Sequence, residues 1–93
     1  MSPRFAEDLC IVLKQLADGH WHRAESLGYP SWGNSMRARV VKELVHSELA
    51  DETGRRAGSE IRIRSKGERL LAAIKNHHPV QDEALRAITE FVK

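Results

Sequence analysis

Apolar residues recur at helical spacing in four parts of the chain, and each part predicts an amphipathic helix. These helices are expected over residues 3–18, 34–47, 66–76 and 81–92. Their apolar positions are Phe5, Leu9, Val12, Leu13 and Leu16; Met36, Val40, Val41, Leu44 and Val45; Leu70, Leu71 and Ile74; and Leu85, Ile88, Phe91 and Val92.

Capping residues support the bounds of two of these helices. Ser2 and Pro3 are suited to the start of the first helix, and Gly19 is suited to its end. Ser65 is expected to cap the third helix, and Glu68, three residues further on, completes the pattern of a capping box.

Alternation of apolar and polar residues predicts three short strands. The first covers 20–22, with Trp21 turned inward between two outward histidines, and a short helix at 23–27 follows it. The other two, at about 49–53 and 60–64, are expected to form a hairpin. Its return strand alternates strictly, in the order Ile61, Arg62, Ile63 and Arg64.

The predicted fold class is therefore α+β, with a three-helix core beside a small antiparallel sheet. An unrelated small α+β domain is the alternative. The length of 93 residues suits a single domain over 1–93. Apolar residues make up 41% and charged residues 30%, which is a globular composition.

Composition also narrows the class of protein. No apolar run approaches the roughly 20 residues that span a bilayer, and the N-terminus does not resemble a secretory signal. One cysteine, Cys10, excludes an internal disulfide and fits a reducing compartment. We therefore expect a cytoplasmic protein without contact to a membrane.

The net charge of +2 is unevenly distributed. Residues 31–67 hold eight basic and five acidic side chains, net +3, whereas 1–30 are net −1 and 68–93 are neutral. Within 54–67, five cations accompany a single acid, Glu60. A localised basic surface of this kind favours a polyanionic partner.

Residues 40–71 resemble the winged helix-turn-helix family. The matching positions are Leu44, Glu48 and Leu49 at the end of a helix, and Ser65, Lys66 and Gly67 at the start of the next. The resemblance implies a recognition helix at 35–47, a wing tip at 54–59 and a preceding helix at 23–27. Glu48 departs from the pattern, because glycine is usual there and tolerates positive φ.

The residue types of the second helix agree with a DNA-binding role. Arg37, Arg39 and Lys42 are expected to project from one side, suited to a major groove. Asn34 and Ser35 at its N-terminus can contact phosphates or base edges. Trp32 can stack on sugar or bases, or pack beneath the turn.

The hairpin supplies the other candidate contacts. Arg55 and Arg56 at the tip can reach a minor groove or the backbone, and Arg62 and Arg64 share one strand face that can follow phosphates. Lys66 completes the basic set. The alternative is that Arg62 and Arg64 pair with Glu48 or Asp51 across the hairpin. If six of these cations contact phosphates, the logarithm of the binding constant should fall with the logarithm of the salt concentration with a slope of about −5.

We therefore expect a small, nucleoid-associated transcriptional regulator that binds double-stranded DNA sequence-specifically. Two alternatives remain: a winged-helix module that binds an acidic protein, and a DNA-binding protein of replication, recombination or chromatin architecture. The last helix, within 77–93, either closes the core against the first helix or pairs with its copy in a homodimer.

Other chemistry finds little support. No phosphate-binding loop, nucleophile elbow or triad spacing is present, so we expect no enzyme and no cofactor. His20 with His22, and His77 with His78, form two pairs, but without a closed Cys/His cluster we expect no metal site. No motif indicates a small-molecule ligand.

Overall fold

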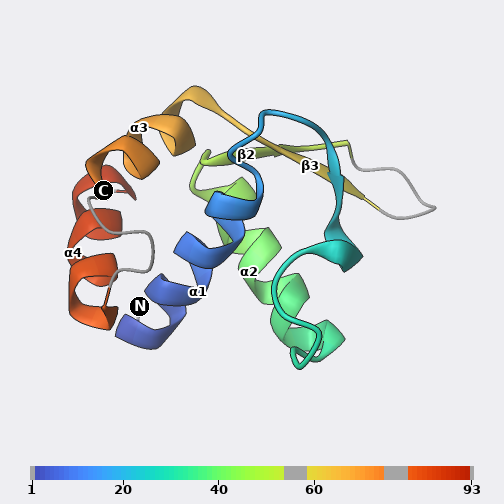
Figure 1. Ribbon diagram of the computed structural model, residues 1–93, viewed down its shortest axis with the longest axis horizontal. Coiled ribbons are helices and arrows are strands. Elements are labelled where there is room, and N and C mark those ends of the chain that lie inside the picture. Colours follow the sequence, from blue (N-terminus) through green and yellow to red (C-terminus); the bar gives the residue numbers. More distant parts are fainter. Residues whose placement is uncertain (1, 54–58, 75–79, 93) are drawn as a thin grey trace.

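The computed structural model describes residues 2–53, 59–74 and 80–92. Within them the order is α1 (Pro3–Gln15), β1 (His22–Arg23), the one-turn 3-10 helix η1 (Ala24–Ser26), α2 (Asn34–His46), β2 (Ala50–Glu52), β3 (Glu60–Ile63), α3 (Ser65–Ala73) and α4 (Gln81–Val92). Over these residues the fold is α+β, with four α-helices and one three-stranded antiparallel sheet, as predicted (Figure 1).

Helix α1 is the centre of the helical part. It contacts α2, α3 and α4, and it lies between α4 and α2 in Figure 1, with the sheet across the top of the view. Every α-helix and strand β3 contribute fully buried side chains to one core, among them Leu9, Leu44, Ile61, Leu70 and Ile88. Burying such side chains stabilises the fold by about 1.5–3 kcal/mol each.

Strand β3 is the middle strand of the sheet, whose order is β1-β3-β2. Both pairings are antiparallel, with His22 opposite Ile61 and Asp51 opposite Arg62. The alternation predicted for β3 is confirmed, because its two isoleucines are buried and Arg62 is exposed. Since side chains alternate along a strand, this register fixes which face of the hairpin meets the core.

The start of α1 is as predicted, but its end is earlier. The Ser2 hydroxyl accepts a hydrogen bond from the Phe5 N–H at 3.2 Å, and Pro3 is the first helical residue. The helix ends at Gln15, because the following amides bond three residues back, as Ala17 N–H does to the Lys14 carbonyl. Gly19 then turns the chain with a φ of 78°.

Two expectations about local structure are wrong. Trp21 is not in the core: its exposed fraction is 41%, because strand β1 begins only at His22 and leaves Trp21 in the loop before it. Ser65 is not a cap. It is the first residue of α3, with Arg64 in the capping position and no side-chain capping bond there.

The C-terminal end of α2 is closed by backbone bonds. The amides of Glu48 and Leu49 donate to the carbonyls of Val45 and Leu44, at 3.1 and 2.9 Å. This is a Schellman motif, in which the residue after the cap takes a left-handed conformation. Glu48 has a φ of 63°, so a non-glycine residue occupies the strained position that the sequence pattern identified.

Gly67 allows α3 to approach the end of α2 closely. A Cβ at this position would lie 2.4 Å from the Leu49 carbonyl oxygen and 2.8 Å from Cγ1 of Ile63. The same carbonyl accepts a hydrogen bond from the Arg64 N–H at 3.0 Å. Gly67 is therefore required by the packing of α3 against the chain that leaves α2.

Helix α4 closes the core. It packs against α1 and α3, with Ala84 and Ile88 buried and Leu85 and Phe91 partly buried. Of the two roles considered for this helix, the structure shows the packing against α1. Among the described residues, no helix has both the length and the apolar character that a membrane span requires.

Candidate nucleic-acid interface

Helix α2 presents a continuous exposed face that carries cations and no acid. Its buried side consists of Val40, Val41 and Leu44, which hold it in the core. The exposed residues follow helical spacing on the opposite side: Ser35, Ala38, Arg39, Lys42 and His46. We call these five residues the α2 face. Glu43, the one acid within α2, is half-buried, and its carboxylate accepts a hydrogen bond from the Ser47 hydroxyl at 2.7 Å.

The α2 face stands between two grooves. One groove, of about 520 Å³, separates α2 from η1 and the hairpin, and Ala24, Val45 and Ser59 are among its lining residues. The other, of about 330 Å³, lies between α2 and the start of α1, and Phe5 and His46 are among its lining residues. Lys42 lines both. The helix is therefore accessible along both flanks.

Arg39 and Lys42 are the exposed cations of this face. The Arg39 guanidinium lies over the Phe5 ring, 5.3 Å from its centroid, which orients the side chain without neutralising it. Among the described residues, Lys42 has no ion pair. Both charges thus remain available to an anionic partner.

Arg37 does not project from α2 as expected. Its Nε donates to the Leu27 carbonyl at 2.7 Å, and its terminal nitrogens reach the carbonyls of Tyr29 and Trp32 at 3.2 and 3.3 Å and the Asn34 side chain at 3.3 Å. The planar guanidinium suits this fan of acceptors. Arg37 therefore fastens the turn before α2 to the helix.

The N-terminal end of α2 has no side-chain cap, because Gly33 occupies the capping position. The first bond along the helix is that of the Arg37 amide to the Gly33 carbonyl, so the amides of Asn34, Ser35 and Met36 precede it. Asn34 and Ser35 are exposed beside these N–H groups. The arrangement suits an anion at this end.

Trp32 lies beneath the turn. A Cβ on Gly28 would overlap the Trp32 ring, with the closest ring atom at 2.2 Å, so the indole packs directly on this glycine. Its ring also meets that of Tyr29 edge-to-face, with centroids 5.8 Å apart. Of the two roles considered, packing beneath the turn is the one that the structure shows.

The outer face of the hairpin carries balanced charge rather than a run of cations. Arg64 lies 3.5 Å from the Asp51 carboxylate and 3.9 Å from that of Glu48. For Arg64, this confirms the alternative that it pairs with acids across the hairpin. Arg62 instead lies over the Trp21 ring at 4.9 Å from its centroid. Folding places acidic residues of the preceding segment beside the arginines of the return strand. A count of charged residues over 54–67 does not include these acids.

The remaining candidates divide by position. Lys66 is half-buried in the first turn of α3, and it forms no ion pair with another described residue. The described residues do not include 54–58. The predicted wing tip at 54–59, with Arg55 and Arg56, therefore lies outside them except for Ser59. The α2 face is therefore the candidate site whose geometry is known.

The first histidine pair has a partner other than a metal. The His22 ring lies 2.9 Å from the Asp18 carboxylate, and the His20 amide donates to the same carboxylate at 2.9 Å. The hydrogen bond from His22, then that from His20, lowers the pKa of Asp18. Within residues 2–53, 59–74 and 80–92 no three metal-ligating side chains gather. His77 and His78 lie outside these ranges.

Sequence reasoning missed the internal role of Arg37 and the aromatic support of two exposed arginines. Nothing in the spacing of Arg37 identifies backbone carbonyls as its partners. Arg39 with Phe5, and Arg62 with Trp21, join residues that are 34 and 41 positions apart (39 − 5 and 62 − 21), so only the folded chain reveals them. Comparisons with models of known protein families, with curated proteins and with solved structures find no match.

Proposed function

We propose that this protein is a winged-helix protein that binds double-stranded DNA, with α2 in the major groove. The observation that carries the proposal is the α2 face, in which Arg39 and Lys42 are exposed and no acid is present. A helix with side chains is about 10–12 Å across, which matches a major groove about 12 Å wide.

The layout of the fold supports the same proposal. The order helix, strand, short helix, helix and hairpin is compatible with the winged-helix pattern that residues 40–71 resemble. In that pattern α2 is the recognition helix and the hairpin of β2 and β3 is the wing. The near-neutral strands leave the recognition helix as the principal contact, with Arg62 and Lys66 as further phosphate contacts.

Arg39 and Lys42 have different parts in the proposed mechanism. The Arg39 guanidinium, oriented over Phe5, has the fork that reads the edge of guanine. Lys42 acts as a point charge on a phosphate. The amide N–H groups of Asn34 and Ser35 donate hydrogen bonds to a further phosphate at the helix N-terminus. Arg37 is excluded from reading bases, because it holds the turn.

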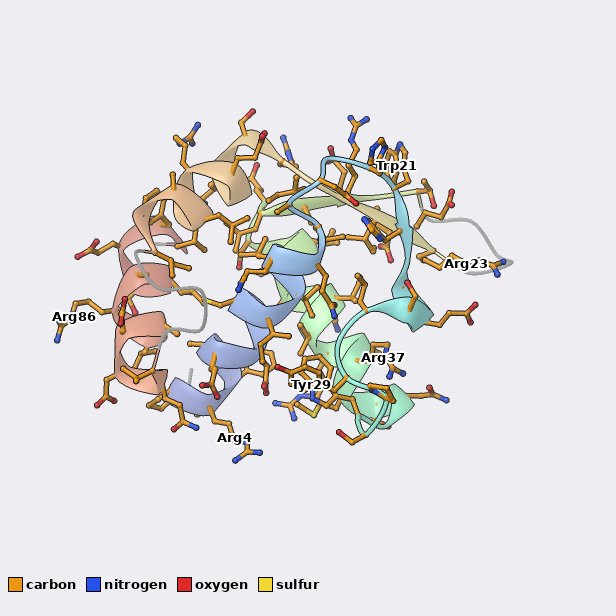
Figure 2. The ribbon with its side chains drawn as sticks, viewed as in Figure 1. Arg4, Trp21, Arg23, Tyr29, Arg37 and Arg86 are labelled. Atoms are coloured by element: carbon orange, nitrogen blue, oxygen red, sulfur yellow. The ribbon has the colours of Figure 1, made fainter. Side chains whose placement is uncertain are left out.

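Fluorescence anisotropy of a labelled duplex of about three helical turns tests the proposal. The test variant is Arg39→Ala with Lys42→Ala. The matched control is Arg69→Ala with Arg86→Ala, which removes the same charge from exposed positions on α3 and α4. Figure 2 labels Arg86 on α4. We expect the test variant to bind more weakly, with a salt slope less steep by about 1 because Lys42 is the phosphate contact of the pair, and the control to bind like wild type.

Two results would refute DNA binding by this face. One is the absence of duplex binding even at low salt, which would favour the alternative of an acidic protein partner for the same cations. The other is an equal loss in both double variants, which would indicate general attraction between charges. Selection from a random duplex library separates a regulator from an architectural protein, because Arg39→Ala should relax a regulator's preference by about 1–3 kcal/mol.

Homodimerisation stays a prediction. Ile88, which the sequence analysis placed in the apolar stripe of α4, is buried in the core of one chain, so a dimer contact there has to use the partly buried Leu85 and Phe91. Sedimentation equilibrium with and without a palindromic duplex tests it. A monomer that binds one half-site would remove the two-fold arrangement from the proposal.

A further inference from the structure

A cavity of about 660 Å³ lies between α1 and the segment that leads into α2. Ile11 of α1 lines one side, and Tyr29, Trp32 and Met36 line the other. Figure 2 labels Tyr29 between α1 and the turn. Pockets that bind small molecules have volumes of about 300–1,000 Å³ and walls that are largely apolar and aromatic. The volume of this cavity lies in that range. Half of the described residues that line it are apolar or aromatic, and the other half are charged or polar.

Asp8 brings a carboxylate to the cavity. Its residue is 93% buried (100 − 7), yet among the described residues it has no hydrogen bond or ion pair within the protein. Burial raises the pKa of the Asp8 carboxyl, which Arg4 partly counteracts and Glu7 reinforces. Among the described residues no side-chain oxygen is both fully buried and without a hydrogen-bond partner, so the Asp8 carboxylate still meets solvent at the cavity. A partly desolvated carboxylate of this kind favours a cation beside it.

The aromatic wall favours the same charge. The rings of Tyr29 and Trp32 meet edge-to-face at 71°, and both residues line the cavity. Faces of aromatic rings attract ammonium groups, and most strongly where water is partly excluded. Two anions and two cations line the cavity, which leaves its net charge at zero. Of these, Arg4 is exposed and points away from the molecule in Figure 2, Glu7 and Lys14 are half-buried, and Asp8 is buried.

From this geometry we infer that the cavity binds a small organic cation. The ligand carries an amine or quaternary ammonium group on an apolar body. Its charge lies toward Asp8 and the two aromatic rings, and its body packs against Ile11 and Met36. A neutral or anionic molecule of the same shape lacks the first of these interactions and binds less tightly.

The cavity is linked to α2 through Arg37. This side chain donates to the carbonyls of Tyr29 and Trp32, the two aromatic wall residues, and Met36 lies in the first turn of α2. An occupant that restrains these residues restrains the N-terminal end of α2. A consequent change in duplex affinity rests on the proposed function, whereas binding of the cation does not.

Calorimetric titration of the free protein with benzyltrimethylammonium tests the site, with phenylacetate and benzyl alcohol as anionic and neutral probes. We expect saturable binding of the cation, at least about tenfold tighter than either other probe. Asp8→Asn should remove this preference, and Asp82→Asn, an exposed carboxylate on α4, should retain it. Asp8→Asn should fold, because it removes a partly desolvated charge.

Binding must also be located. In methyl NMR spectra the cation should shift the signals of Ile11 and Met36 and leave that of Ile88 unchanged. The site is refuted by no saturation up to about 10 mM cation, by equal affinity for the three probes, or by binding that survives Asp8→Asn. These titrations contain no DNA. Cation binding is therefore tested independently of duplex binding, and either can fail without the other. A titration of the duplex complex then measures the coupling separately.

Discussion

The chain enters and leaves helix α2 by two turns that are held in different ways. The entry turn, residues 27–33, begins at buried Leu27 and is held beyond it by side-chain hydrogen bonds. Gln15 bonds both backbone groups of Gly28, at 2.6 and 3.2 Å, and Arg37 bonds the carbonyls of three turn residues. The exit turn, residues 47–49, is closed by backbone bonds beneath buried Leu44 and Leu49.

The difference separates an adjustable end of α2 from a fixed one. Hydrogen bonds at a partly exposed site compete with water and contribute about 0.5–1.5 kcal/mol each. Buried leucines and a backbone closure cannot open without exposing the core. The entry turn also borders the cavity that contains Asp8, whereas the exit turn meets α3 through Gly67. We therefore expect ligands to act on the entry end and core packing to hold the exit end.

Gly67→Ala should have the largest effect on stability, because Gly67 packs against the exit turn of α2. The new Cβ would meet the Leu49 carbonyl oxygen, which belongs to the backbone and cannot rotate away. We expect the free energy of unfolding, measured by urea titration, to fall by about 2–3 kcal/mol. Arg69→Ala, exposed on the same helix, should change it by less than about 0.5 kcal/mol. A Gly67→Ala protein as stable as wild type would show that α3 does not press on this turn.

Arg37→Ala should have an intermediate effect that is confined to the entry end. Loss of its hydrogen bonds should lower the free energy of unfolding by about 1–2 kcal/mol. Native-state hydrogen exchange should become faster at the amides of Gly28 and Trp32 and stay unchanged at Leu49. Arg39→Ala, two residues along the same helix, is the control and should leave all three rates as they are. Equal acceleration at all three amides in Arg37→Ala would remove the distinction between the two ends.

Glu48→Gly should have the smallest effect, and it should stabilise the protein. Glycine adopts the φ of 63° without strain, and the ion pair lost with Arg64 is long and exposed. We expect the free energy of unfolding to rise by about 0.5–1 kcal/mol. Glu48→Ala removes the same carboxylate but keeps the strain, so it should stay near wild type. Stabilisation by both variants alike would trace the gain to the carboxylate instead.

Much of the fold could be predicted from the sequence, because local patterns determine it. The stripe of α1, the Ile/Arg alternation of β3 and the special position of Glu48 were each visible as spacing or residue type. Trp21 was misplaced because alternation was extended into a loop, since β1 has only two residues. Ser65 was misplaced by one residue at a helix start, where Arg64 precedes the helix without a side-chain capping bond.

The candidate site could be predicted only in part. Arg39 and Lys42 follow from the helical period, which separates the exposed side of α2 from its buried side. The orientation of the Arg37 side chain toward the entry turn could not be predicted, because its acceptors are backbone carbonyls that only the fold brings close to it. The positive charge of Arg64 is balanced by Asp51, and this pairing depends on the register that places β2 beside β3. The cavity beside Asp8 likewise exists only once α1 and the entry turn meet.

Backbone amide NMR of the protein titrated with a mixed-sequence duplex tests the use of the α2 face most directly. We expect the largest shifts at Asn34, Ser35, Arg39 and Lys42, smaller shifts along β3, and none at Arg86 on α4. These shifts should vanish as salt is raised, because phosphate contacts release counterions. Shifts that gather on α4, or that spread evenly over the molecule, would contradict the proposal that α2 enters the groove.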